Sequence, residues 1–395
     1  MISDIYCKLN QLRANVHLSE RFYRHIYSAN VALVHNLKSE FGEFFPLLAE
    51  QLALKVRAKE KLPHLWEKGC LFSRIPLEQS TSWAVACWKA SLFSGKTLLS
   101  LTGGLGVDDL AFSSRFDEIT SLDPDSGLNC LFDYNAGCLS AHNVQRLTTT
   151  AEQYLSSTDQ VFDLIYADPD RRAGKSRSNT DAGQWSPDIF QLLAEHRQKG
   201  RRWLIKLSPM VDLSWLRRKL NEPAGIYVIS HGQEIKELLV ELGTDVSDTV
   251  RVVDIDSGHE AFVWGGEPIP LIHTAHRQFY EATPGLIKSG LAQALAESAG
   301  LQDAAGNFTF FTGTANLPRP LFRSFRLVQE LDGGLQTVKK WLQEQGIDRA
   351  NISSRNYTLG AEEVRKKLGL KDGGDWYLFF TGRDSSKRCF ICRKE

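Results

Sequence analysis

The chain has 395 residues, of which 42% are hydrophobic and 24% charged, and this length suits roughly two or three domains with buried cores. Its 47 basic and 47 acidic residues cancel, so the net charge attracts no polyanion, and a nucleic acid would have to bind a local basic patch. No window reaches the roughly 20 apolar residues of a spanning helix, and the N-terminus lacks an apolar signal core. We therefore expect a soluble protein with no membrane partner.

The cysteines are scattered through apolar stretches. They are Cys7, Cys70, Cys87, Cys130, Cys138, Cys389 and Cys392. An odd number with this scatter is typical of a reducing compartment and not of a disulfide framework, so we expect a cytoplasmic protein. Cys389 and Cys392 form a CxxC pair without a second pair, which favours two strand residues over zinc ligands. No metal cofactor is expected.

Residues 1–75 are predicted to form an N-terminal helical region. Apolar residues recur there near the helical period, first from Phe22 to Leu37 and again from Phe44 to Leu54. From Lys96 onward the pattern changes, and short β-rich runs alternate with segments of helix length. The runs are 97–101, 118–122, 144–149, 161–167, 202–207 and 226–230. This alternation predicts an α/β fold, with a parallel sheet and helices on both faces, over residues 76–265.

A Pro/Gly-rich segment, Gly265–Pro270, separates this sheet from a tail with a different pattern. An amphipathic helix is predicted around 287–299 and a strand at 308–312. The last part predicts strands near 323–329 and 376–381, with helices at 335–344 and 362–368. The tail is therefore expected to be an α+β region, which we divide into 270–320 and 321–395.

The first β-rich run ends in the glycine cluster "LTGGLGVDD", which predicts a bend where the backbone approaches a ligand. A dinucleotide site would need a third glycine where Asp109 stands, so an NAD or FAD site is disfavoured. The preceding segment, 90–97, nearly matches a phosphate loop. However, its helix comes before its strand, the reverse of the required order, so a helix end and a turn are favoured.

A third kind of ligand site, besides the dinucleotide site and the phosphate loop, also places glycines after a strand, and it binds S-adenosylmethionine. Asp123 ends the second run about 20 residues after the glycines, a spacing that suits a carboxylate accepting both ribose hydroxyls. The stretch resembles the first motif of class I methyltransferases. The resemblance implies donor contacts from Thr102 (at the first glycine's position), Gly103, Gly104, Gly106 and Asp123, with Glu152 near the adenine. The usual strand-one acid is Ser100 here, so Asp108 or the backbone is expected to hold the amino group of the donor. A tight turn without a ligand, and an ordinary strand-end acid, are the alternatives.

The fourth run ends in Asp168-Pro169, which puts a carboxylate at the edge of the sheet where α/β proteins bind ligands. In amino-methylating enzymes a D/N-P-P-Y/F element lies there, and its side chain and proline carbonyl accept hydrogen bonds from the target amine. Asp168 and Pro169 are the corresponding catalytic candidates. Asp170 and Arg171 stand where proline and the aromatic residue would be, so Arg171 and Arg172 are expected to stack on a base or pair with phosphate. A strand-ending turn and a solvated ion-pair surface are the alternatives.

Further segments resemble class I methyltransferases with a C-terminal THUMP-like domain. They are "KLPHLW", "LEQSTSWAVACWKA", "YEATPGLIKSG", "SSRNYTLGAEEVRKKLGLKDGG" and "WYLFFTG". The resemblance implies that the EQSTS segment covers the donor site, with Glu78, Gln79 and Ser80 near donor or target. Ser80 or Thr81 is equally well interpreted as a helix cap.

The same resemblance implies a ferredoxin-like unit at 270–320 and a THUMP-like domain at 321–395. THUMP domains take part in RNA binding, so RNA is the implied partner. Basic residues of the tail alternate with aromatic ones, as in RNA-binding surfaces. They are Arg323, Arg326, Arg355, Arg365, Lys366, Lys367, Lys387 and Arg388. The alternative for the lysines is the solvated face of an amphipathic helix.

Taken together, these features predict an S-adenosylmethionine-dependent methyltransferase that acts on a base of an RNA. A methyltransferase of a small molecule or protein is the first alternative. A catalytically inert RNA-binding protein that kept the fold is the second, and Ser100 and Asp170 are the departures that favour it.

Overall fold

The computed structural model describes residues 2–27, 34–171, 185–232, 234–257, 261–264, 272–317, 321–382 and 386–394. The chain divides into two compact units, each described by itself below. Unit 1 comprises residues 1–225 and 239–247, and unit 2 comprises residues 226–238 and 248–395.

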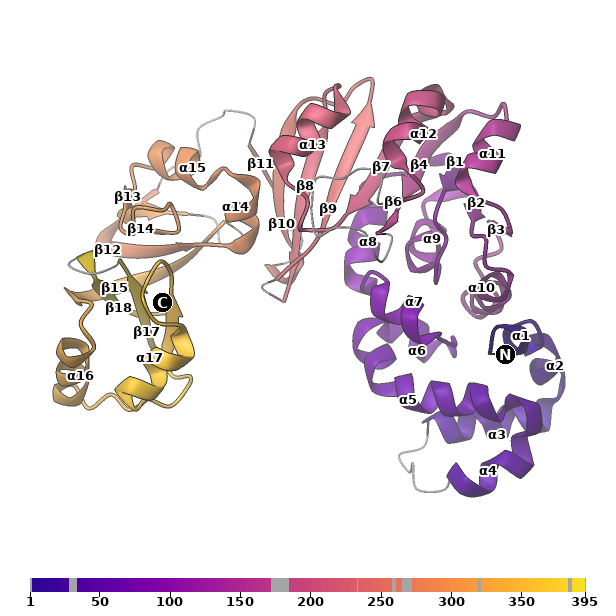
Figure 1. Ribbon diagram of the computed structural model, residues 1–395, viewed down its shortest axis with the longest axis horizontal. Coiled ribbons are helices and arrows are strands. Elements are labelled where there is room, and N and C mark those ends of the chain that lie inside the picture. Colours follow the sequence, from indigo (N-terminus) through magenta and orange to yellow (C-terminus); the bar gives the residue numbers. More distant parts are fainter. Residues whose placement is uncertain are drawn as a thin grey trace. The chain divides into compact units, whose positions relative to one another are not determined.

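Unit 1 begins with helices, as the apolar periodicity predicts (Figure 1). They are α1 (Ile2–Tyr6), α2 (Leu9–Ala14), α3 (Val16–Tyr27), α4 (Val34–Phe41), α5 (Phe45–Lys61), α6 (Pro63–Glu67) and α7 (Arg74–Gln79), with a 3₁₀ turn at Gly42–Phe44. The longest, α5, buries Leu47, Leu48 and Leu54. Pro46 stands in its first turn, where a missing N–H costs no helical hydrogen bond.

The centre of unit 1 is a parallel sheet of the predicted kind (Figure 1). Its strands are β1 (Gly95–Ser100), β2 (Phe116–Leu122), β3 (Val144–Leu147), β4 (Phe162–Ala167) and β7 (Gly200–Leu207). Their order is β7-β4-β1-β2-β3, and each neighbouring pair is parallel. The chain thus goes from β1 to one side for β2 and β3 and returns to the other side for β4. Such a switch point opens a crevice at the carboxyl ends of the strands.

One helix precedes these strands and the others follow them along the chain. They are α8 (Trp83–Ser91), α9 (Val107–Phe112), α10 (Ser126–Leu139), α11 (Ala151–Ser157), α12 (Ile189–His196) and α13 (Leu213–Leu220). Local sequence fixes where several begin. The carboxylate of Asp125 caps α10 by accepting the N–H of Leu128 at 3.0 Å, and Thr150 with Gln153 forms a capping box on α11. Because α8 precedes β1, the order is the reverse of that in a phosphate loop, as expected. The prediction of a helix end and a turn holds only up to residue 94, since residues 95–97 begin β1.

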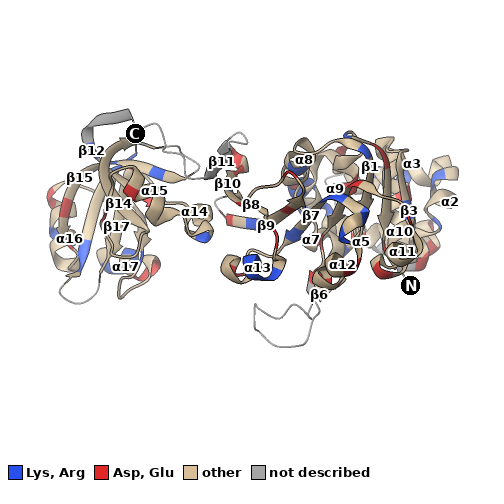
Figure 2. Ribbon diagram, turned by 90° about the horizontal axis from the view of Figure 1, so that it is seen from above, with Lys and Arg blue, Asp and Glu red and all other residues tan. Residues whose placement is uncertain are grey.

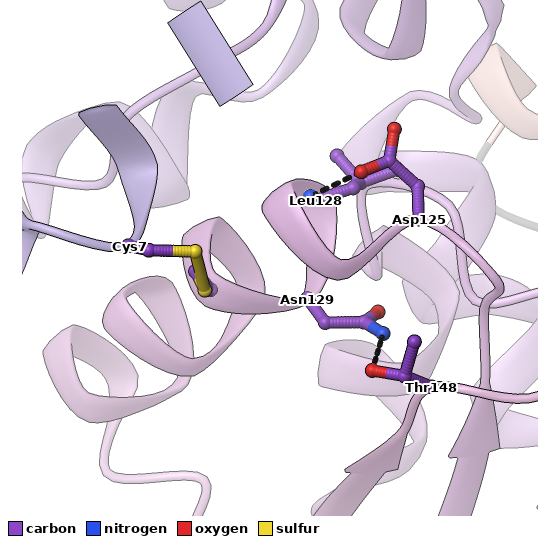
Figure 3. Close-up of a disulfide and its surroundings, with 6 residues drawn as sticks. Cys7, Asp125, Leu128, Asn129 and Thr148 are labelled. Atoms are coloured by element: carbon purple, nitrogen blue, oxygen red, sulfur yellow. Dashed lines mark hydrogen bonds between the residues drawn. A yellow bond between two sulfur atoms is a disulfide. The ribbon is translucent and has the colours of Figure 1, made fainter. Parts of the chain in front are cut away.

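One disulfide corrects the interpretation of the cysteines. Cys7, directly after α1, is bonded to Cys130 of α10, 123 residues further along the chain (Figure 3). The bond joins the N-terminal helices to the helix that begins beside Asp125. The absence of a disulfide framework was inferred from sequence scatter, which carries no information about two positions so distant in the chain.

This pairing predicts a specific labelling pattern. Protein denatured without reductant should incorporate alkylating reagent at the five cysteines that are free in the structure, and at Cys7 and Cys130 only after reduction. Peptide mass spectrometry checks this result. Labelling of both residues before reduction would show that the disulfide is absent from the purified protein.

Unit 2 contains the strands β10 (Thr249–Asp254) and β11 (Ala261–Trp264) and most of β8 (Gly225–His231), while β9 (Glu234–Gly243) is divided between the units. A separate sheet has the order β13-β14-β12-β15-β18-β17-β16. These strands are β12 (Ile272–Ala282), β13 (Gln302–Asp303), β14 (Phe310–Asn316), β15 (Phe322–Asp332), β16 (Asn351–Ser354), β17 (Trp376–Thr381) and β18 (Arg388–Arg393). Cys389 and Cys392 are buried within β18, which confirms that both are strand residues.

The helices of unit 2 are α14 (Pro284–Ser289), α15 (Ala292–Ser298), α16 (Leu335–Glu344) and α17 (Ala361–Leu368). The prediction of one helix over 287–299 is wrong. Gly290, with a φ of 74°, ends α14, and α15 starts after it. A left-handed residue at this position stops a helix, and glycine adopts it without strain. No helix in the described ranges is long and apolar enough to span a membrane.

Candidate active site

A cleft of about 390 Å³ lies at the carboxyl ends of β1, β2 and β4. Thr102 follows β1, Asp123 follows β2 and Asp168 follows β4, and all three line it. The sequence-predicted residues along the cleft are Gln79, Ser80, Thr102, Gly103, Gly104, Gly106, Asp108, Asp123, Glu152 and Asp168. Residues predicted separately from different motifs are therefore brought together by the fold.

The glycine bend (residues 102–106) needs glycine for two reasons, collision and backbone conformation. A side chain at Gly103 would collide with Arg146, and one at Gly106 would collide with Phe132. Gly104 has a φ of 51° and Gly106 a φ of 80°, both in the left-handed region. At Gly104 a Cβ would meet nothing within 4 Å, so the side of the bend facing the cleft is open. The bend is thus packed against Arg146 and Phe132 on one side and open to the cleft on the other, so a ligand can approach its backbone.

The carboxylate of Asp123 is held by two backbone groups. Its Oδ2 accepts the N–H of Gly104 at 2.8 Å, and its Oδ1 accepts the N–H of Asp125 at 2.9 Å. Each oxygen has a second lone pair, so the group retains capacity to accept two further hydrogen bonds. A fixed carboxylate with two such positions suits a pair of neighbouring hydroxyls.

Asp108 forms a buried polar cluster beside the bend. Its Oδ1 lies 2.8 Å from the ammonium of Lys89, a side chain with no exposed surface, and its Oδ2 accepts the hydroxyl of Tyr166 at 2.7 Å. Lys89 also donates to Thr81 Oγ1 at 3.1 Å. Burial opposes ionisation of Asp108, but Lys89 and Lys206 outweigh it and hold the pKa of Asp108 below its ordinary value. A fixed, ionised carboxylate, paired with Lys89, therefore lies close to the bend.

Asp168 is anchored from two directions. Its backbone N–H donates to Thr102 Oγ1 at 2.7 Å, which ties the end of β4 to the end of β1. Its Oδ2 forms an ion pair with the ammonium of Lys206, near the end of β7. Thr102 therefore positions the catalytic candidate in addition to lining the cleft.

Asp170 lies in the small strand β5 (Asp170–Arg171), which pairs with β6 (Trp185–Ser186). It lines the cleft as well. Partial burial raises the pKa of Asp170, and the negative charge of Asp168 adds to this effect while Lys206 opposes it. The position that holds proline in amino-methylating enzymes thus adds a second acid to the rim.

The remaining predicted residues differ in their placement. Pro169 is not among the cleft-lining residues, and neither is Glu78. Arg171 has its backbone in β5 but its side chain is not described, and Arg172 lies outside the described residues. The hydroxyl of Ser80 donates to Leu77 O at 3.0 Å, and the residue that precedes α8 is Ser82. The interpretation of Ser80 or Thr81 as the cap of α8 is therefore wrong.

Four residues that contact the predicted site residues or their partners were not predicted in that role: Thr81, Lys89, Arg146 and Lys206. Lys89 and Lys206 were detectable in principle, because each interrupts an apolar segment, "WAVACWKA" and "WLIKL" respectively.

Basic residues also occupy the last turn of α13, where Figure 2 shows Lys and Arg side by side. They are Arg217, Arg218 and Lys219.

In the described part of the chain, no group of three or more His, Cys, Asp or Glu side chains is arranged to hold a metal ion.

Comparison with known proteins agrees with this architecture. Residues 322–394 match the family described as THUMP domain-like. The chain is similar to the crystal structure of a candidate methyltransferase from Porphyromonas gingivalis W83, with 24% identity, 99% of this chain and 97% of that chain covered, and a TM-score of 0.76. This likeness shows the fold. An α/β methyltransferase fold followed by a THUMP-like domain is therefore confirmed.

Two further structures match only part of the chain. An rRNA methylase from Streptococcus thermophilus is 12% identical, with 40% of this chain and 93% of that chain covered and a TM-score of 0.31. A human methyltransferase 10 domain containing protein is 10% identical, with 48% of this chain and 96% of that chain covered and a TM-score of 0.36. No curated protein sequence matches the chain significantly.

Proposed function

We propose that this protein transfers a methyl group from S-adenosylmethionine to a nitrogen on a base of an RNA. The observation that carries the proposal is the convergence of the glycine bend, Asp123 and Asp168 on one cleft at the switch point of a methyltransferase fold. The cleft volume of about 390 Å³ falls in the range of small-molecule sites.

The residues present fit the donor. Asp123 would accept both ribose hydroxyls, since each of its oxygens keeps one lone pair after binding a backbone N–H. The open face of Gly104 lets the backbone approach the nucleoside, and Glu152 would lie on the adenine side. Ser100, at the position of the usual strand-one acid, carries no charge. Asp108, held ionised by Lys89, would instead supply the negative charge that binds the amino group of the donor.

S-adenosylmethionine supplies an electrophilic methyl group on a positively charged sulfur. The contribution of the chain is alignment, because an in-line displacement at the methyl carbon depends mainly on the position of the attacking atom. The carboxylate of Asp168 would accept an N–H of the target, direct the nitrogen lone pair toward the methyl group, and receive the proton that nitrogen loses after transfer. Lys206 and Thr102 keep Asp168 in place for this task.

RNA is proposed as the substrate because residues 322–394 match a THUMP-like domain. Exposed basic residues of this domain, Arg355, Lys366 and Lys367, form no ion pair within the described residues. In contrast, Arg323 pairs with Glu281, Arg365 with Glu362 and Arg388 with Glu330. The unpaired side chains are the better candidates for phosphate contacts.

The proposal is tested by offering purified protein and methyl-labelled donor to total RNA from cells that lack the gene. Label should enter one RNA fraction and stay out of RNA from cells that carry the gene, whose target is already modified. If the protein binds the donor but no RNA fraction takes up label, the substrate is a small molecule or a protein instead.

Replacing Arg355, Lys366 and Lys367 together by Gln should weaken RNA binding and flatten its salt dependence. The logarithm of the association constant falls as the logarithm of the salt concentration rises. For each phosphate that a basic side chain no longer neutralises, the magnitude of this negative slope becomes smaller by about 0.7 to 0.9. Affinity measured at several salt concentrations checks this result. The control, Arg57, Lys59 and Lys68 to Gln, removes the same charge from exposed positions in and near α5 and α6. Equal slopes for the two variants would exclude the THUMP-like domain as the site that binds RNA.

A further inference from the structure

We propose that Arg146 of β3 is a positioning residue that holds the donor-binding loops in their bound geometry from beneath. The inference rests on the proposed function for the identity of the ligand. Arg146 does not line the cleft, and its side chain has no exposed surface. It belongs to none of the motifs by which the donor site was predicted.

The guanidinium contacts the glycine bend directly. Nη1 donates to the carbonyl oxygen of Gly104 at 3.1 Å. The backbone N–H of Gly104 donates to Asp123 Oδ2 at 2.8 Å. The backbone of Gly104 is therefore fixed at its N–H by the ribose-binding candidate and at its carbonyl by Arg146.

A second contact leads to the loop after β2. Nη1 of Arg146 also lies 3.4 Å from Asn129 Oδ1, and the amide of Asn129 donates to the backbone carbonyl of Asp123 and to Thr148 Oγ1, each at 2.9 Å. Figure 3 shows the contact between Asn129 of α10 and Thr148 beyond β3. Arg146 thus reaches Asp123 by two routes, one through Gly104 and one through Asn129.

A third contact fixes helix α9, which starts after the bend. Nη2 of Arg146 lies 3.3 Å from Asp109 Oδ2, and Asp109 is only 2% exposed. Burial raises the pKa of Asp109, while the charge of Arg146 and a hydrogen bond from Ser121 oppose this effect. The planar guanidinium also lies 3.9 Å from the ring centre of Phe132.

These contacts explain two of the glycines in the bend. Side chains at Gly103 and Gly106 would occupy the space of Arg146 and Phe132. Arg146 thus packs beneath the bend, and its planar guanidinium with five donors can contact the bend, α9 and α10 at once, which a lysine ammonium cannot.

The test must separate positioning from loss of a buried charge. Arg146→Met alone would leave Asp109 buried without its partner and would destabilise the fold, whereas replacing both partners of a buried pair can be nearly neutral. The informative variant is therefore R146M/D109N. The control, R202M/E241Q, removes the 2.8 Å ion pair between Arg202 of β7 and Glu241 of β9, which does not line the cleft.

Two measurements on the full chain decide the matter. Isothermal calorimetry should give a dissociation constant for S-adenosylmethionine about tenfold or more above wild type for R146M/D109N, an intermediate value for R146K, and an unchanged one for R202M/E241Q. Hydrogen–deuterium exchange without donor should be faster in peptides covering 101–110 of R146M/D109N and unchanged in peptides covering β7.

The two readouts distinguish the possible failures. Unchanged exchange at 101–110 overturns the role of Arg146 whether or not the donor binds. Faster exchange with an unchanged dissociation constant shows that the support is structural only and also overturns the inference. Wild-type protein without any binding heat contradicts the proposed function, while the exchange rates still test the support of the bend.

Discussion

Asp168→Asn is expected to reduce methyl transfer about 10²- to 10⁴-fold while changing donor affinity little. Asparagine keeps the size of the side chain and can accept a hydrogen bond, but it cannot receive the proton that the target nitrogen loses. It also loses the charge that pairs with Lys206. Initial rates of label transfer to the substrate RNA, together with calorimetric donor binding, measure both parts of this prediction.

The matched control is Asp163→Asn, the same substitution near the opposite end of β4. Asp163 Oδ2 accepts the N–H groups of Lys96 and Thr97 at 2.8 and 3.1 Å, far along the strand from the cleft. This variant should transfer methyl at a rate close to wild type. If Asp168→Asn were as active as the control, Asp168 would not receive the proton and the mechanism would need another acceptor.

Lys89→Met is expected to destabilise the protein by about 3 to 5 kcal/mol at pH 7, because it leaves Asp108 buried without the ammonium group that contacts it directly. In wild type the pKa of Asp108 is lowered, so its pairing contributes fully above the ordinary carboxylate pKa of about 3.9 and is lost only as the pH falls through the lowered value. In the variant, burial is no longer outweighed by Lys89 and the pKa of Asp108 should rise. At acid pH, protonation of Asp108 then removes the uncompensated charge, and the variant is destabilised less.

The pH dependence of thermal unfolding tests this explanation. The difference in melting temperature between wild type and Lys89→Met should be largest near pH 7 and smaller near pH 4. Lys96→Met is the control, since Lys96 is exposed at the start of β1 and should cost no more than about 0.5 kcal/mol. A pH-independent difference would mean that poorer packing around the missing lysine stem, and not the uncompensated charge of Asp108, causes the destabilisation.

The predicted residues that the structure brings to one cleft share one physical property. Gly104, Asp123 and Asp168 each follow an apolar strand, and in a parallel sheet all strand ends of one kind meet at one edge. The pattern of strands and loops was therefore enough to predict that they converge on one cleft.

The residues that were missed depend on pairings that local patterns do not contain. Arg146 acts through the carbonyl of Gly104, 42 residues earlier, and Cys7 bonds to Cys130 across 123 residues. Lys206 is conspicuous in its apolar segment, but its partner Asp168, which follows the neighbouring strand β4, lies 38 residues earlier in the chain. Gly290 interrupts a helical period that continues on both sides of it, so periodicity alone predicted one helix where there are two.

The disulfide joins the N-terminal helices to the helix α10, which borders the proposed donor site. Cys130 lies in α10, whose first turn is capped by Asp125 (Figure 3). Asn129 of the same helix donates to the backbone carbonyl of Asp123. The N-terminal region is thus covalently attached to an element that also supports the carboxylate proposed to bind ribose.

Calorimetric titration with S-adenosylmethionine tests the central claim most directly, because it needs no knowledge of the RNA. We predict single-site binding to wild type and at least about tenfold weaker binding to Asp123→Ala, which lacks the carboxylate that accepts charge-assisted hydrogen bonds. Asp117→Ala, an exposed change near the start of the same strand β2, should bind like wild type. Absence of heat with wild type, or equal affinity for all three proteins, would contradict the assignment of this cleft to the donor.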